Sequence, residues 1–278
     1  MAPIYSIETS VEIAEALRKL GFNLKENLQI ADLDRNNWIV VPHEFTGGKY
    51  SLEMNPARIS SCSAVERVGK DLEINYKNTS KDSLGREFVG TNNWKESLML
   101  NQFLGVKTPN MKEEIDYLDV LYLGSQGVVK VYDVSGKQVD SKLCEKYLMD
   151  TIGGKSLWRA EWIDNDFKKK GKNLEVRFNH IFDKEGNAVN YESEVLDGNT
   201  LMKDEQVDVI DFITENHTSQ GHVHKKVNAG NFYSYFPRDD DNSVAAFGAN
   251  SVRAVLDCNR GPSVRNSSLG VRAAKLRE

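Results

Sequence analysis

The C-terminal stretch VAAFGANSVRAVLDCNRGPSVRNSSLGVRAAKLRE, residues 244–278, decides the predicted fold because part of it alternates strictly. Apolar side chains stand at every second position, and chemically mixed side chains stand between them. The apolar set is Ala254, Leu256 and Cys258, and the mixed set is Arg253, Val255, Asp257 and Asn259. Successive side chains of a β-strand point to opposite faces, so this spacing predicts a strand with one buried face. A catalytic site requires particular residue types, whereas the other face carries chemically mixed side chains without an evident pattern. We therefore interpret that face as a binding surface on a fixed scaffold.

The composition excludes several classes of protein. The chain has 278 residues, of which 40% are hydrophobic and 28% charged, and its formal net charge is -5 at pH 7. These values are typical of a globular protein with a buried core, and the excess of positive charge that nucleic-acid binding requires is missing. No apolar stretch has the length of a membrane span, and the first residues lack the basic and apolar regions of a signal peptide. We therefore expect no nucleic-acid partner, no membrane insertion, and a cytoplasmic or virion-associated location.

Apolar spacing and turn residues predict the helices. A capping-box spacing begins a helix over residues 9–21. Residues 93–105, NWKESLMLNQFLG, and residues 204–216 also have helical spacing. Residues 113–124, EEIDYLDVLYLG, fit a helix or a strand.

Strand signals are more frequent than helix signals. They comprise WIVVP at residues 38–42, hairpins at 128–140 and 174–195, and the C-terminal segments NFYSYF, SVAAF, RAVLDC and LGVRAA. Together they predict an α+β fold of short antiparallel strands, two or three helices and much irregular structure. We expect a single domain over residues 1–278. The alternative is an N-terminal part, residues 1–150, followed by a ligand-binding part, residues 151–278.

Two polar clusters could bind a metal ion. His222 and His224 would share one face of an extended chain, with His217 nearby, but no carboxylate or cysteine at ligand spacing accompanies them. An exposed loop is the favoured interpretation. The acidic residues 239–241 lack the glycine and the terminal glutamate of a calcium loop, so a tight polar turn between strands is favoured there.

The cysteines indicate neither a disulfide framework nor a zinc site. Cys62, Cys144 and Cys258 are far apart in the chain and form no paired motif. Cys258 belongs to the apolar set of the alternating strand, where a thiol stays protonated and acts as a small apolar side chain. We predict no metal, no cofactor and no enzymatic activity.

Two further residue pairs receive structural interpretations. Trp158 and Trp162 lie four residues apart and are predicted to stack on one face of a helix. Arg272 lies inside the apolar strand LGVRAA, and we predict a buried structural cation with Glu161 as its carboxylate partner.

The spacing of the C-terminal residues is similar to that of a known family. The pattern Phe247-x-Ala249-x-Ser251-x-x-Ala254-x-Leu256-x-Cys258, then Pro262-Ser263, then Ser267-x-Leu269-Gly270-Val271-Arg272, resembles the variable proteins of diversity-generating retroelements. These proteins occur in bacteria, phages and archaeal viruses. Upstream segments are similar too, namely Glu161-Trp162-Ile163-Asp164 with Phe167, Thr200-Leu201-Met202 and Tyr235-Phe236-Pro237-Arg238. The similarity covers residues 158–275.

The resemblance implies a C-type lectin fold, in the branch that also contains formylglycine-generating enzymes. It further implies a hypervariable segment that binds a macromolecular ligand, either a protein or a cell-surface receptor, and we expect the binding protein to be a monomer. The ligand-binding positions would be those between the constant ones: Gly248, Asn250, Val252, Arg253, Val255, Asp257, Asn259, Arg260, Val264, Arg265, Asn266 and Ser268.

The chain also departs from the relatives of that fold. The enzymes of the branch use a cysteine pair near this strand, whereas this chain has only Cys258 there. The EPN, QPD and WND motifs of calcium-dependent sugar binding do not occur in the sequence, so the fold name does not predict carbohydrate binding. Two alternatives to a binding protein stay open. One is an enzyme related to the formylglycine-generating oxidases that uses Cys258 or the histidines, and the other is a structural virion component.

Overall fold

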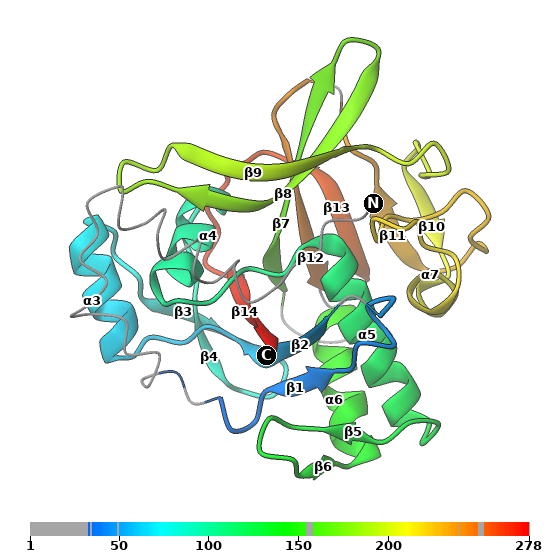
Figure 1. Ribbon diagram of the computed structural model, residues 1–278, viewed down its shortest axis with the longest axis horizontal. Coiled ribbons are helices and arrows are strands. Elements are labelled where there is room, and N and C mark those ends of the chain that lie inside the picture. The colour runs from blue at the N-terminus through cyan, green and yellow to red at the C-terminus, as the bar shows by residue number, and fades with distance from the viewer. Residues whose placement is uncertain are drawn as a thin grey trace.

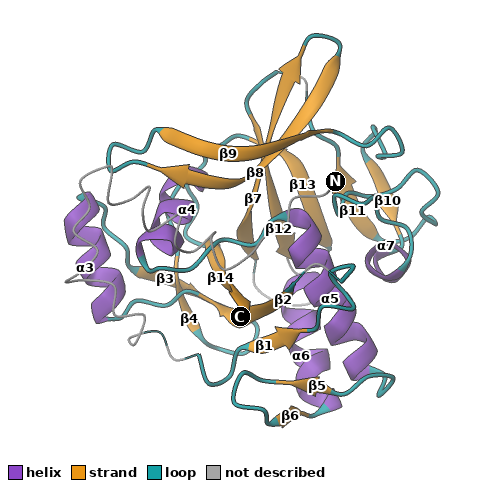
Figure 2. Ribbon diagram, in the orientation of Figure 1, coloured by secondary structure: helices purple, strands orange, loops and turns teal. Residues whose placement is uncertain are grey.

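A ten-stranded sheet runs through the computed structural model, which describes Leu33 and residues 35–48, 50–153, 158–238, 240–249 and 253–277 (Figure 1). Two small hairpins and five helices complete the architecture of the described residues (Figure 2). The α+β class predicted from the sequence is confirmed.

The large sheet combines strands from both halves of the chain. Its continuous order is β1 (Ile39–Val41), β2 (Ser51–Arg58), β14 (Leu269–Arg277), β7 (Arg159–Lys170), β12 (Ser243–Ala249), β13 (Ala254–Arg260), β11 (Phe232–Tyr235) and β10 (Glu205–Val207). A second branch leaves β7 through β8 (Asn173–Phe182) to β9 (Ala188–Val195). Most neighbours are antiparallel, but β14 with β7 and β11 with β13 are parallel. A domain boundary at residue 150 would therefore cut through this sheet.

The predicted strands and hairpins of the second half of the chain are present. The four C-terminal segments form β11, β12, β13 and β14, and the predicted hairpin of residues 174–195 is β8 with β9. The hairpin of residues 128–140 is β5 (Val131–Tyr132) with β6 (Gln138–Val139), and Gly136 adopts a φ of 83° in its turn. A third hairpin, β3 (Asn78–Lys81) with β4 (Glu87–Val89), was not predicted.

The helices outnumber the expected two or three. The described residues form α3 (Ser63–Leu72), α4 (Trp94–Phe103), α5 (Met111–Ser125), α6 (Ser141–Ile152) and α7 (Val209–Thr214). The prediction of α4 is confirmed, and the ambiguous stretch at residues 113–124 is helical. The predicted helix of residues 204–216 is present only as α7, because residues 205–207 form the strand β10. Asn93 and Asn110 close full capping boxes with Glu96 and Glu113, which fixes the starts of α4 and α5. The predicted helix of residues 9–21 lies outside the described residues.

The two faces of the large sheet are covered differently. On one face, Ala254, Leu256, Cys258 and Phe247 join a core that α5, α6 and α7 close (Figure 1). On the other face, α4 packs its apolar side chains on β7, β12 and β14. The residues under α4 are Ala160, Trp162, Val244, Ala246 and Leu269. The apolar cluster under α4 contains no residue of β11 or β13.

The helical interpretation of Trp158 and Trp162 is wrong, because Trp162 lies in the middle of β7 and Trp158 just precedes it. The first nine residues of β7 are all buried, which reflects a central strand covered on both faces. Such a strand loses the alternation of apolar and polar residues by which sequence patterns reveal strands.

Buried charges join β2, β7 and β14 to α6. Arg272 Nη2 donates to Glu161 Oε1 at 3.0 Å, with both side chains at most 1% exposed, so the predicted pair is confirmed. Beside it, Arg58 Nη1 donates to Asp150 Oδ2 at 2.7 Å, and Arg159 Nε donates to Asp150 Oδ1 at 2.9 Å. A buried charge is tolerated only when it is paired in this way.

Candidate ligand-binding site

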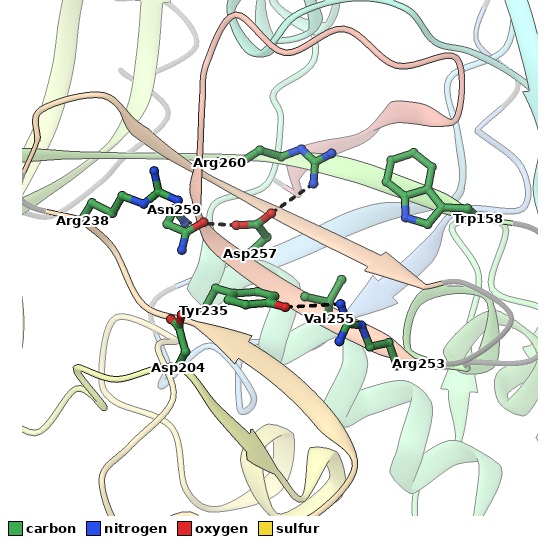
Figure 3. A pocket seen from close by; sticks show the side chains of 9 residues that line it. All are labelled: Trp158, Asp204, Tyr235, Arg238, Arg253, Val255, Asp257, Asn259 and Arg260. Atoms are coloured by element: carbon green, nitrogen blue, oxygen red, sulfur yellow. Dashed lines mark hydrogen bonds and ion pairs between the residues drawn. The ribbon is translucent and has the colours of Figure 1, made fainter.

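A pocket of about 400 Å³ opens on the sheet face that carries β11 and β13 (Figure 3). Five of the residues that line it belong to the predicted ligand-binding set, and four do not. The first group is Arg253, Val255, Asp257, Asn259 and Arg260, and the second is Trp158, Asp204, Tyr235 and Arg238. Each residue from 253 to 260 in the predicted set is half-buried, so its side chain is reachable from solvent while its position is held.

The register of β11 with β13 determines which side chains meet. The two strands are parallel, with Tyr233 beside Val255 and Tyr235 beside Asp257. Residues at the same level of neighbouring strands point to the same face. Leu256 and its neighbour Ser234 face the opposite side and are buried. Two tyrosines of β11 and the mixed residues of β13 therefore share one outward face.

Arg253 is held by the two tyrosines. Its guanidinium carbon lies over the Tyr233 ring at 3.9 Å from the ring centroid, and Nη2 donates to the Tyr235 hydroxyl at 3.3 Å. The two tyrosine rings are stacked with centroids 6.3 Å apart. A cation over an aromatic face gains about 0.5–1 kcal/mol at an exposed site. These contacts orient the Arg253 side chain before any ligand is present.

Asp257 and Arg260 form an ion pair at the other end of the pocket. Arg260 Nη1 donates to Asp257 Oδ2 at 3.1 Å, and the Asn259 N–H donates to Asp257 Oδ1 at 3.2 Å. Burial raises the pKa of Asp257 above its ordinary value, and the charges of Arg260 and Arg238 partly oppose that rise. The Arg260 guanidinium also lies 5.6 Å from the Trp158 ring centroid.

Gly248 does not belong to the displayed residues, which corrects the sequence prediction. It is buried in β12 between β7 and β13, and an added Cβ would lie 3.1 Å from the Ala160 Cβ and 3.4 Å from the Val255 Cγ1. The prediction failed because β12 is an interior strand, and Ala160 on β7 and Val255 on β13 crowd the position of Gly248 from both sides. Asn250 and Val252 lie outside the described residues.

The remaining predicted positions lie in the connection from β13 to β14 and contact the start of α4. Arg265 is exposed, forms an ion pair with Glu96, and donates from Nη1 to the Thr91 carbonyl at 3.2 Å. Val264 packs against the apolar cluster under α4. The side chain of Asn266 accepts from the Ser268 N–H at 2.9 Å, which closes a local turn. This second group is not part of the pocket lining.

The structure also locates the residues considered for catalysis or metal binding. Cys258 is 3% exposed, and burial raises the pKa of its thiol well above the ordinary value. The expected exposed loop at the histidines is wrong for His222, which is 1% exposed and lies with its ring tilted against Phe167, at 5.5 Å between centroids. His217 and His224 are half-buried. The described residues contain no group of three or more histidine, cysteine or acidic side chains arranged to hold a metal ion.

The acidic residues at 240 and 241 form a turn between strands, as the sequence indicated. Asp240 Oδ1 accepts from the Asn242 N–H at 3.1 Å, and Asp241 has a φ of 57°. Asp239 lies outside the described residues.

Sequence reasoning missed four lining residues and the role of Tyr233. The alternation of Tyr233 and Tyr235 in NFYSYF carried a usable signal, because it places two aromatic side chains on one strand face, and aromatic residues are enriched in binding surfaces. Trp158, Asp204 and Arg238 reach the pocket from connecting segments that no periodicity describes.

Comparisons of the chain with models of known families, with curated proteins and with solved structures find no match. None of the described helices combines the length and the apolar character of a membrane span.

Proposed function

We propose that this chain is a non-enzymatic binding protein that holds a macromolecular ligand on the outward face of β13 and β11. The observation that carries the proposal is the meeting of five predicted ligand-binding residues, 253, 255, 257, 259 and 260, in one pocket. The alternating residues Ala254, Leu256 and Cys258 are buried beneath them. A strand that hides every second residue can change the displayed ones without changing its core.

The proposed binding face lies on two neighbouring strands of the sheet. A sheet face presents its side chains without the loop ordering that reduces affinity elsewhere. Arginine and aromatic residues dominate the binding energy of known interfaces. Here Arg253, Arg260, Tyr235 and Trp158 line one pocket, and contacts among them restrict their rotamers.

The proposal extends to the family. We propose the C-type lectin-like fold of the variable proteins of diversity-generating retroelements, in a monomeric chain that is cytoplasmic or virion-associated. The burial of the constant positions Phe247, Ala249, Leu256 and Leu269 supports this assignment. The test is the DNA beside the coding region. A near-copy of the 3′ end that differs at adenines, next to a reverse-transcriptase gene, is expected, and its absence from the native locus would contradict the family assignment.

The burial of Cys258 favours the binding proposal over an enzyme that uses this thiol as its nucleophile. Thiolate chemistry requires a low thiol pKa and access to substrate, and the buried Cys258 has neither.

The binding function is tested by selection from a random peptide library displayed on phage, with the full chain immobilised. Val255→Arg fills the pocket, and Val128→Arg is the matched control because Val128 is 68% exposed and is not a lining residue. We expect clones that bind the wild type and the Val128→Arg variant, and that bind the Val255→Arg variant at least about tenfold more weakly. Recovery of clones that never distinguish the two variants would contradict the proposal.

A further inference from the structure

The charges of the pocket are unlike those of the whole molecule. The chain carries a formal net charge of -5, whereas the pocket is lined by three arginines and two aspartates. Both aspartates already have partners. Asp257 is paired with Arg260, and Asp204 Oδ1 accepts from the Phe236 N–H at 3.2 Å. The pocket is therefore a local site of positive charge on an acidic protein.

Arg238 is a pocket cation that has no partner among the described residues. It is exposed and lines the pocket, and within the described residues no hydrogen bond or ion pair holds its guanidinium. Its charge reaches Asp257, whose pKa it lowers. Figure 3 places Arg238 on the side of Asp257 and Asn259 that lies away from Trp158. Arginine presents a planar set of N–H donors that matches a carboxylate.

The other lining residues favour a peptide over a polyanion. Tyr235, Trp158 and Val255 offer aromatic and aliphatic surface beside the arginines. A nucleic acid would bring a phosphate at every unit of its backbone, whereas the lining offers three arginines, one of which is already paired with Asp257. A peptide can instead place isolated carboxylates against arginines and apolar side chains against the rings.

We propose that the pocket recognises an acidic segment of a partner protein, and that Arg238 binds one of its aspartate or glutamate carboxylates. This inference rests on the proposed function, since it names the ligand class of the same site. In this proposal, Asp257 competes with the ligand carboxylates for Arg260. It neutralises Arg260 in the unliganded protein, so its removal makes a second guanidinium available to the ligand.

The competition predicts opposite effects for two near-isosteric substitutions. Arg238→Gln removes the accessible cation, and we expect the affinity for acidic peptides to fall by about tenfold or more. Asp257→Asn releases Arg260, and we expect the affinity for the same peptides to rise by a similar factor. If Arg238 and Asp257 only maintained the structure of the pocket, both substitutions would weaken peptide binding. Arg277→Gln is the matched control, because Arg277 is exposed at the far end of β14.

The probes are the peptides that were selected on the wild type and that bind the Val255→Arg variant much more weakly. We expect these peptides to be enriched in aspartate and glutamate relative to the unselected library. Synthetic copies with asparagine and glutamine at those positions should bind about tenfold more weakly, and a single-stranded oligothymidylate should not compete with the acidic peptides. Thermal unfolding of each variant confirms that its fold is retained.

The outcomes separate this inference from the proposed function. If pocket-dependent peptides are obtained without acidic enrichment, or if their amide copies bind equally well, the acidic-ligand inference is wrong and the binding function stands. Competition by the oligothymidylate also overturns the peptide assignment. If no peptide depends on the pocket, both proposals are wrong.

Discussion

Leu256 and Asp257 are neighbours on β13, yet their side chains lie on opposite sides of the sheet. Leu256 is 1% exposed in the core closed by α5, α6 and α7, whereas Asp257 lines the pocket on the outward face. Adjacent residues of this strand therefore have different roles: Leu256 stabilises the core, and Asp257 belongs to the proposed binding site.

This relationship predicts unequal effects of alanine substitutions on β13. Leu256→Ala should reduce the free energy of unfolding by about 2–5 kcal/mol, because it leaves a cavity in the core. Arg253→Ala should reduce it by only about 0.5–1 kcal/mol, since its contacts are near the surface. Urea unfolding of both variants measures the difference. Similar losses for the two variants would show that the faces of β13 are assigned incorrectly.

The buried pair Arg272–Glu161 predicts a large loss when one partner is removed. Arg272→Ala removes the cation that lies 3.0 Å from Glu161 and 3.7 Å from Glu114, and leaves these two buried carboxylates with Arg58, 3.8 Å from Glu161, as the remaining cation. The loss should be about 3–5 kcal/mol of unfolding free energy. Arg277→Ala on the same strand is the control, and it should change stability by less than about 0.5 kcal/mol because Arg277 is exposed. Chemical denaturation of the two variants is the measurement, and equal stability would be incompatible with the buried network.

His180 predicts a loss of stability at alkaline pH. Burial alone would lower the pKa of His180, but Asp164 at 2.6 Å from Nδ1 and Asp166 at 3.3 Å from Nε2 outweigh it and raise the pKa to about 9. A raised histidine pKa contributes stability that is fully present below the ordinary value of 6.5 and disappears as the pH rises through about 9. The loss should be on the order of 3 kcal/mol.

The measurement for His180 is urea unfolding across this pH interval. The wild type should lose stability as the pH rises, and His180→Gln should show a much flatter dependence because it cannot carry the charge. A variant with the same pH dependence as the wild type would assign the effect to other groups.

The close packing around Gly248 predicts that a larger residue at this position reduces the stability of the protein. Gly248→Ala would put a Cβ 3.1 Å from the Ala160 Cβ, and we expect a loss of about 1–3 kcal/mol from overpacking. Gly261→Ala is the matched control, because its nearest neighbour would be the Val264 Cγ2 at an ordinary 3.7 Å. Thermal unfolding compares them. Equal stability of Gly248→Ala and the wild type would restore Gly248 to the set of freely variable positions.

The elements that could be predicted from the sequence are those with strong local patterns. The helical spacing of residues 93–105 and the alternation of Ala254, Leu256 and Cys258 are local features, and they predicted α4 and β13. The partner of Arg272 was also predictable, because a buried cation requires a carboxylate.

The failures of sequence reasoning arose where tertiary contacts decide. β7 is covered on both faces and carries no alternation. The burial of Gly248 depends on the neighbouring strands β7 and β13, and the pocket depends on the parallel register of β11 with β13. No single segment of sequence contains these relationships, since each joins residues far apart in the chain.

The most direct test of the central claim is a serine scan of residues 253–260 on β13, measured for both unfolding free energy and binding of the selected peptides. The account predicts a period of two: serine at 256 and 258 lowers stability, whereas serine at 253, 255 and 257 changes peptide binding with little loss of stability. Stability losses without alternation, or binding changes confined to the buried positions, would contradict the division of this strand into a structural face and a recognition face.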